Sequence, residues 1–182
     1  MKRSMIFKPA SGSKAFTAIT FLTYLLLPAI GISQSANEHF KNALTEDKAE
    51  HYCNVIQHCN LAIQTNPANA EAFYLRGKAR FVLKDFNGAI KDERKAAQLN
   101  LETENVYLIS AFAKQELKQY KSAIADFSKA ISINPENNIA YYHRGFANAK
   151  LNNKKQSRAD FSRAIELGLG EPADHLFEIE PE

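Results

Sequence analysis

The sequence predicts an all-α protein made of about four helical hairpins in a row. The main evidence is a repeat: when the stretch 140–167 is shifted back by 34 residues and then by 34 again, Gly145 falls on Ala111 and then on Gly77. Self-similarity at a fixed period in this range is typical of repeat arrays. Apolar residues spaced three and four apart, with helix-breaking Asn-Pro pairs between repeats, indicate that each repeat is helical.

The period divides the chain into four units, each expected to form two helices joined by a short turn. The first unit is degenerate because its first helix has few apolar residues, whereas the other three are clear. The units are 36–69, 70–103, 104–137 and 138–168, followed by an acidic tail or short capping segment at 169–182. The turns inside the three clear units are expected near Lys84, Lys118 and Asn152.

Residues 1–33 are expected to be a signal peptide. The start of this leader contains basic but no acidic side chains, and an apolar run follows at 15–28. Small residues then suit cleavage after Ser33, with Ser35 as the next choice. We therefore expect an exported protein, periplasmic or secreted. The alternative is that residues 15–32 are retained as a membrane anchor, although 18 residues are few for a bilayer span.

The leader also explains the net charge of +3. Four of the 23 basic residues lie in it, namely Lys2, Arg3, Lys8 and Lys14, and none of the 20 acidic residues does. Removal of the leader therefore leaves 19 basic against 20 acidic side chains. A mature chain that is almost neutral gives no reason to expect a nucleic-acid partner. It would meet a membrane only through an uncleaved leader.

The recurring residues resemble the tetratricopeptide repeat, or TPR. Each clear unit has an aromatic residue in its first helix, a small residue four positions later and an alanine in its second helix. These residues are Phe73, Tyr107 and Tyr141; Gly77, Ala111 and Gly145; and Ala96, Ala130 and Ala164. The resemblance covers about residues 36–168 and implies a right-handed α-solenoid.

Charged residues in the repeat predict salt bridges between neighbouring helices. Asp92, Asp126 and Asp160 recur at the repeat period, and Arg76 and Arg144 lie two periods apart. Because a guanidinium group forks onto a carboxylate, we expect Arg–Asp bridges between helices. The alternative is that these charges bind a ligand, but such pairs are commonly structural.

Glu93 occupies the second-helix position that holds Phe127 and Phe161 in the next two units. A lone buried carboxylate is costly, so we expect Glu93 to pair with Arg80 or Lys114. Both of these stand where the TPR family usually has an aromatic residue in the first helix. Loss of Glu93 should then destabilise the array.

The resemblance further implies that ligands bind in a concave groove formed by the first helix of each unit. The residues that would face this groove are mostly aromatic or apolar, which suits a peptide or helix with large apolar anchors. They are Tyr74, Lys78, Phe81, Leu108, Phe112, Gln115, Tyr142, Phe146 and Lys150, together with Phe40, Leu44, Glu71, Asn105 and Ile139. The alternative is that some of the aromatic side chains pack on each other, but we expect half of them to be exposed.

No residues suggest catalysis, a cofactor or a metal site. His51 and His58 lie seven positions apart, about 10 Å along a helix, which is too far to share one metal ion. Cys53 and Cys59 are too far apart within one helix for a disulfide. Cys59 falls on the apolar stripe, whereas Cys53 is expected to be exposed and could bridge to a second chain.

These observations favour an exported, non-enzymatic interaction module whose rigid curved surface binds a short segment of a protein or peptide partner. The alternative is a self-assembling scaffold of the cell envelope, and hence a homo-oligomer. An enzyme is disfavoured, because the sequence has no nucleotide loop, nucleophile elbow or paired zinc motif.

Overall fold

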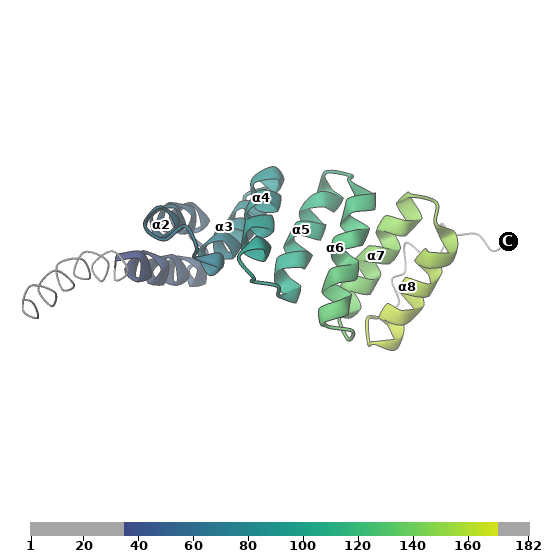
Figure 1. The fold of residues 1–182 in the computed structure, drawn as a ribbon. Helices are drawn as coiled ribbons and strands as arrows, with labels where there is room; N and C mark the ends of the chain where they lie inside the picture. The colour runs from purple at the N-terminus through teal and green to yellow at the C-terminus, as the bar shows by residue number, and fades with distance from the viewer. Residues whose placement is uncertain (1–34, 171–182) are drawn as a thin grey trace, which may run out of the picture.

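The computed structural model describes residues 35–170, and the regular structure of this part of the chain is entirely helical (Figure 1). The expected signal peptide, and residues 171–182 of the expected tail, lie outside the described residues. A first helix covers residues 35–48, and α2 (Tyr52–Thr65) follows it. No described helix is long and apolar enough to cross a bilayer.

The helices after α2 form three consecutive helix-turn-helix pairs. These pairs are α3 (Ala70–Val82) with α4 (Phe86–Gln98), α5 (Glu104–Glu116) with α6 (Tyr120–Ile133), and α7 (Asn138–Lys150) with α8 (Lys154–Glu166). Each helix contacts the next one along the chain, so that neighbours in sequence are also neighbours in space (Figure 1). The expected array of helical hairpins is therefore present.

The turn inside each pair is built around one residue with a left-handed backbone. Lys84, Lys118 and Asn152 have φ angles of 64°, 58° and 59°, and they occupy the same position of successive units. In each case the next residue donates a backbone hydrogen bond of 2.8–2.9 Å to the carbonyl five positions before it. This bond satisfies a carbonyl that the end of the first helix would otherwise leave unpaired. The expected turn positions are confirmed.

Asparagine side chains start the first helix in two of the pairs. The Asn69 Oδ1 accepts a hydrogen bond of 2.9 Å from the Ala72 amide, and the Asn137 Oδ1 accepts one of 2.8 Å from the Ala140 amide. Each bond satisfies an amide of the first helical turn, which has no partner inside the helix. Thr103 stands before α5 in the same way, but its side chain makes no capping bond.

Small residues on the first helix of a pair let the second helix approach closely. A Cβ atom added to Gly145 would lie 3.1 Å from the Phe161 ring, and one added to Gly77 would lie 2.3 Å from Oε1 of Glu93. Ala111 occupies the corresponding position of the unit between them and is fully buried. This close contact sets the spacing inside each pair.

Replacement of Asn69 by alanine should lower the free energy of unfolding by about 1 kcal/mol, because the Ala72 amide loses its acceptor. Thr103→Ala is the matched control, since Thr103 precedes a helix without capping it. Its effect should stay within about 0.5 kcal/mol. Urea denaturation of both variants measures the difference, and equal losses would contradict the capping role of Asn69.

Candidate partner-binding surface

Two of the pairs are joined by an arginine on the first helix and an aspartate on the second. Nε and Nη2 of Arg76 donate to Asp92 at 2.9 and 2.7 Å, which links α3 to α4. Nη2 of Arg144 donates to Asp160 at 2.6 Å, which links α7 to α8. The expected Arg–Asp bridges are therefore present. Both aspartates are nearly buried, so these forked bonds are worth more than surface salt bridges.

Asp126 is held differently in the pair α5–α6. The Ser110 hydroxyl donates to Asp126 at 2.6 Å, and the Lys114 ammonium group donates to the same oxygen. Ser110 occupies the position that Arg76 and Arg144 occupy in the neighbouring units. All three recurring aspartates thus bind groups on the first helix of their own pair.

The pairing expected for Glu93 is wrong. Arg80 donates to Asp92 at 2.6 Å, and Lys114 donates to Asp126. Adjacent residues of a helix point about 100° apart, so the arginine that reaches Asp92 does not also reach Glu93. Neither carboxyl oxygen of Glu93 has a hydrogen-bond partner among the described residues, although only 1% of the residue is exposed. Burial, and secondly the charge of Asp92, raise the pKa of Glu93 to about 9, so the carboxyl is protonated at neutral pH.

Aromatic rings form a continuous row across the first helices of the three clear units. Phe81 on α3 contacts Phe112 on α5, with ring centroids 6.4 Å apart. Phe112 contacts His143 on α7 at 4.8 Å, and His143 contacts Tyr142 at 5.1 Å. These four side chains, the aromatic row, belong to three separate units. They therefore make one surface only when the units are stacked.

The aromatic side chains of the expected groove are less exposed than expected. All six are half-buried, and the expectation that half of them would be exposed is wrong; they are Phe40, Tyr74, Phe81, Phe112, Tyr142 and Phe146. Ring contacts with another helix cover one side of four of them, Phe81, Phe112, Tyr142 and Phe146, as where Phe112 packs on the fully buried Phe127 at 5.4 Å. The alternative, in which some of these residues pack on each other, holds for Phe81 and Phe112, whereas the other ring contacts are to aromatic residues of second helices.

The exposed part of the expected groove comes from other side chains. Ile139 and Leu44 are apolar and keep 48% and 41% of their surface exposed. Glu71, Asn105 and Lys150 are also exposed, whereas Leu108 is buried. The Lys150 ammonium group lies 5.1 Å from the centroid of the Phe146 ring, so it stays beside the aromatic residues.

Lys78 is a link between units rather than an open charge at the rim of the groove. Its ammonium group donates to both oxygens of Asp47, at 2.9 and 2.7 Å. Asp47 lies near the end of the helix at 35–48, so this bond holds the first unit against α3. The repeat period does not separate these two positions, so the repeat pattern does not predict the pair.

His143 was not among the predicted groove residues, yet it lies at the centre of the aromatic row. Its Nδ1 is 3.2 Å from Nε2 of Gln115, which joins α7 to α5. Burial lowers the pKa of His143 to about 4, so the imidazole is neutral at physiological pH. The sequence does contain one indication of this role, because His143 is next to the predicted groove residue Tyr142 in the first helix of the last unit.

The two cysteines differ in their access to solvent. Cys53 is exposed, whereas Cys59 is buried, and burial raises the pKa of the Cys59 thiol to about 12. Cys59 is therefore an inert core residue. Within residues 35–170, no group of three or more His, Cys, Asp or Glu side chains is placed to hold a metal ion.

Comparison with known proteins agrees with this geometry. Residues 111–152 match a model of the TPR repeat, and residues 139–167 match a model of the tetratricopeptide repeat. No curated protein matches the chain. The two family matches support a TPR domain.

Solved structures share the fold at low sequence identity. A crystal structure of MamA is 18% identical over 74% of this chain and 73% of its own, with a TM-score of 0.70. YrrB, described as a TPR protein with an unusual peptide-binding site, is 17% identical over 78% of this chain and 74% of its own, with a TM-score of 0.71. The TPR domain of Arabidopsis OM64 is 25% identical over 65% of this chain and 98% of its own, with a TM-score of 0.62. The expected right-handed α-solenoid of about four TPR-like hairpins is confirmed.

Glu93→Gln should remove a pH dependence of stability. In the unfolded chain a glutamate has a pKa of about 4.3, whereas that of Glu93 is about 9 in the folded protein. The folded state thus keeps a proton that the unfolded chain releases. The stabilisation is complete below the unfolded pKa and is lost as the pH rises toward 9.

Chemical denaturation at about pH 6 and pH 8.5 measures this effect as the stability lost between the two values. Wild type should lose more than Glu93→Gln does. Glu116→Gln removes an exposed carboxyl and should behave like wild type. If Glu93→Gln loses as much stability between the two pH values as wild type does, a group other than Glu93 causes the pH dependence.

Proposed function

We propose that the protein is an interaction module that binds a short segment of a partner protein on the surface formed by α3, α5 and α7. The aromatic row is the observation that carries this proposal, because it crosses all three helices. Its rings are held by contacts with each other and with Phe127, so the surface is formed before a partner arrives. Preorganisation of this kind lowers the entropy cost of binding.

The side chains around the row suggest the chemistry of the partner segment. Ile139 offers exposed apolar surface, and the half-buried rings add to it. Asn105 supplies an exposed amide, and Lys150 supplies a positive charge. A peptide with large apolar side chains and an acidic or polar group beside them fits this set. The likeness to YrrB supports the proposal at the level of the fold, because that protein is described as having a peptide-binding site.

We also propose that the module works outside the cytoplasm. The support is the leader at 1–33, in which a basic start precedes an apolar run and small residues. An uncleaved leader would instead attach the same module to a membrane.

Peptides selected from a random library on the full-length chain test the binding surface. Asn105→Arg should weaken their binding at least about tenfold, because Asn105 lies on the same side of α5 as Leu108 and Phe112. Ala125→Arg adds the same side chain at an exposed position of α6 and is the matched control. Fluorescence anisotropy of labelled peptides gives both affinities. Binding that survives Asn105→Arg and fails in Ala125→Arg would place the site on the second helices.

A further inference from the structure

An arginine on the first helix occupies the same place in the second and fourth units. The Arg76 guanidinium lies 5.3 Å from the centroid of the Phe73 ring, and that of Arg144 lies 5.4 Å from the Tyr141 ring. Besides its aspartate, each arginine also binds a residue on the second helix of the preceding unit. Arg76 donates to Asn60 at 2.6 Å, and Arg144 donates to Ser128 at 3.1 Å. Each guanidinium group thus contacts an aromatic ring on its own helix and polar groups on two other helices.

The third unit has the ring and the aspartate but lacks the arginine. Tyr107 and Asp126 stand in the places of Tyr141 and Asp160, and Ser110 replaces the arginine. A cavity of about 170 Å³ lies here, and its polar lining is Glu93, Arg94, Tyr107, Ser110, Lys114 and Asp126. An engineered cavity of about 150 Å³ is large enough to bind benzene. The space therefore accepts a group as large as a guanidinium with part of its side chain.

The matching place in the fourth unit is a more open depression. It is lined by Arg144, Ser128 and Asp160, and it does not reach the residues that correspond to Glu93, Ala97 and Val106. In the third unit the cavity does extend to these inner residues. The space in the third unit is therefore smaller but more enclosed than the depression of about 360 Å³ in the fourth unit, and it reaches inner residues that the depression does not reach.

The cavity also contains a carboxyl group that lacks a partner. Both oxygens of Glu93 are buried without a hydrogen bond from any described residue. Neither nearby cation pairs with Glu93. Lys114 donates to Asp126, and Arg94, the residue after Glu93 on α4, points about 100° away from it. Asp92 receives two arginines, whereas the equivalent Asp126 receives one lysine. Asp126 therefore has one cationic partner fewer than Asp92 has.

We propose that this cavity is a socket for an arginine side chain of a partner protein. The incoming guanidinium group takes the place that Arg76 and Arg144 hold in their own units, over the Tyr107 ring and beside Asp126 and Glu93. Arginine suits the site better than lysine, because its flat group stacks on a ring while it donates several hydrogen bonds. A metal ion is a poor fit, since the part of the chain that the structure describes has no cluster of three suitable ligands.

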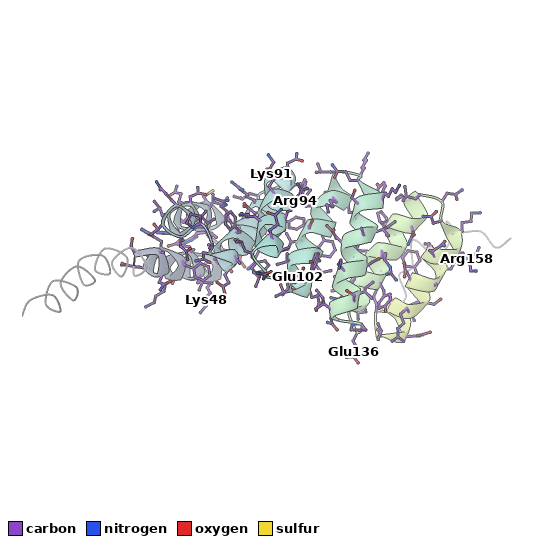
Figure 2. The ribbon with its side chains drawn as sticks, in the orientation of Figure 1. Lys48, Lys91, Arg94, Glu102, Glu136 and Arg158 are labelled. Carbon is purple, nitrogen blue, oxygen red and sulfur yellow. The ribbon has the colours of Figure 1, made fainter. Side chains whose placement is uncertain are left out.

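The socket is separate from the surface proposed above. On α5, Ser110 and Lys114 line the socket, whereas Leu108 and Phe112 belong to the aromatic side. Residues two positions apart on a helix point about 200° apart, so the two sites use opposite sides of α5. One chain could then hold two partner segments at once. Arg94, which Figure 2 labels on α4, is exposed and lines the socket, so its charge opposes the entry of a cation.

A ligand-observed NMR titration of the full-length chain tests the socket with three short peptides. The probes are acetyl-Gly-Arg-Gly-amide and the same peptide with citrulline or lysine in the middle. The arginine peptide should bind at least about tenfold more tightly than the citrulline peptide, which has the same shape without the charge. Glu93→Gln should weaken its binding about tenfold while the protein stays folded, because a guanidinium group favours the ionised form of a carboxyl group beside it and an amide cannot ionise. Arg94→Ser should strengthen its binding, because the repulsion from the Arg94 charge is removed.

A second measurement uses the protein's own side chain as the ligand. In the Arg94→Ser background, Ser110→Arg recreates the residue set of the fourth unit. This change should abolish binding of the arginine peptide and raise Tm by roughly 4 °C. Ser162→Arg adds an arginine at an exposed position of α8 and should change neither property.

Several results would overturn the socket. They are equal affinity for the arginine and citrulline peptides, absence of saturable binding, or unchanged binding after Ser110→Arg. A lysine peptide that binds as tightly as the arginine peptide would overturn the choice of arginine. If the Ser110→Arg protein does not fold, the effect of Glu93→Gln on affinity still decides the question. A negative result for the arginine peptide does not bear on the peptide surface of α3, α5 and α7, so each of the two proposals can be overturned without the other.

Discussion

The close contact between a glycine on the first helix and two adjacent side chains on the second helix is the constraint on which this structure depends. A Cβ atom on Gly77 would lie 2.3 Å from Glu93 and 3.2 Å from the Cβ atom of Asp92. One on Gly145 would lie 3.1 Å both from the Phe161 ring and from the Cβ atom of Asp160. One of the two contacted residues fills the space between the helices, and the other accepts the arginine fork. Packing and charge therefore fix the same pair of helices at the same point.

The junction of the second and third units is where this arrangement changes. Glu93 replaces a phenylalanine and brings a carboxyl group into a space that is apolar elsewhere in the array. Ser110 replaces an arginine and leaves a cavity beside that carboxyl. Either change alone lowers the stability expected for a regular repeat, through an unpaired polar group or through lost contacts. Both changes occur at one place, and the arginine side chain proposed above would complement both of them.

The repeat period predicted the parts of the fold that depend on local sequence. It gave the helices, the turns at Lys84, Lys118 and Asn152, and the Arg–Asp bridges, because each of these involves residues at fixed separations within one unit. It did not show that Glu93 would lack a hydrogen-bond partner among the described residues. Two adjacent carboxylates, at 92 and 93, are equally near Arg80 in sequence, and only the rotation of α4 decides which of them the arginine meets.

The candidate surface was predicted less well, because it depends on contacts between units. The burial of the aromatic residues follows from the angle at which the units stack, which no pattern within a unit records. His143 and Gln115 meet across units in the same way. The missing arginine at Ser110 was visible in the sequence as a break in a series. The consequence of this break could not be predicted from the sequence, because the cavity and the orientation of Glu93 are properties of the folded chain.

Site-specific photo-crosslinking in the native host tests the central claim most directly. A crosslinking amino acid at Ile139, which is exposed on α7 beside the aromatic row, is compared with one at Ala159, which is exposed on α8. The account predicts that Ile139 captures one defined segment of a partner protein, identified by mass spectrometry, and that Ala159 does not capture it. Capture of that partner from Ala159 and not from Ile139 would contradict the claim that the first helices form the binding surface.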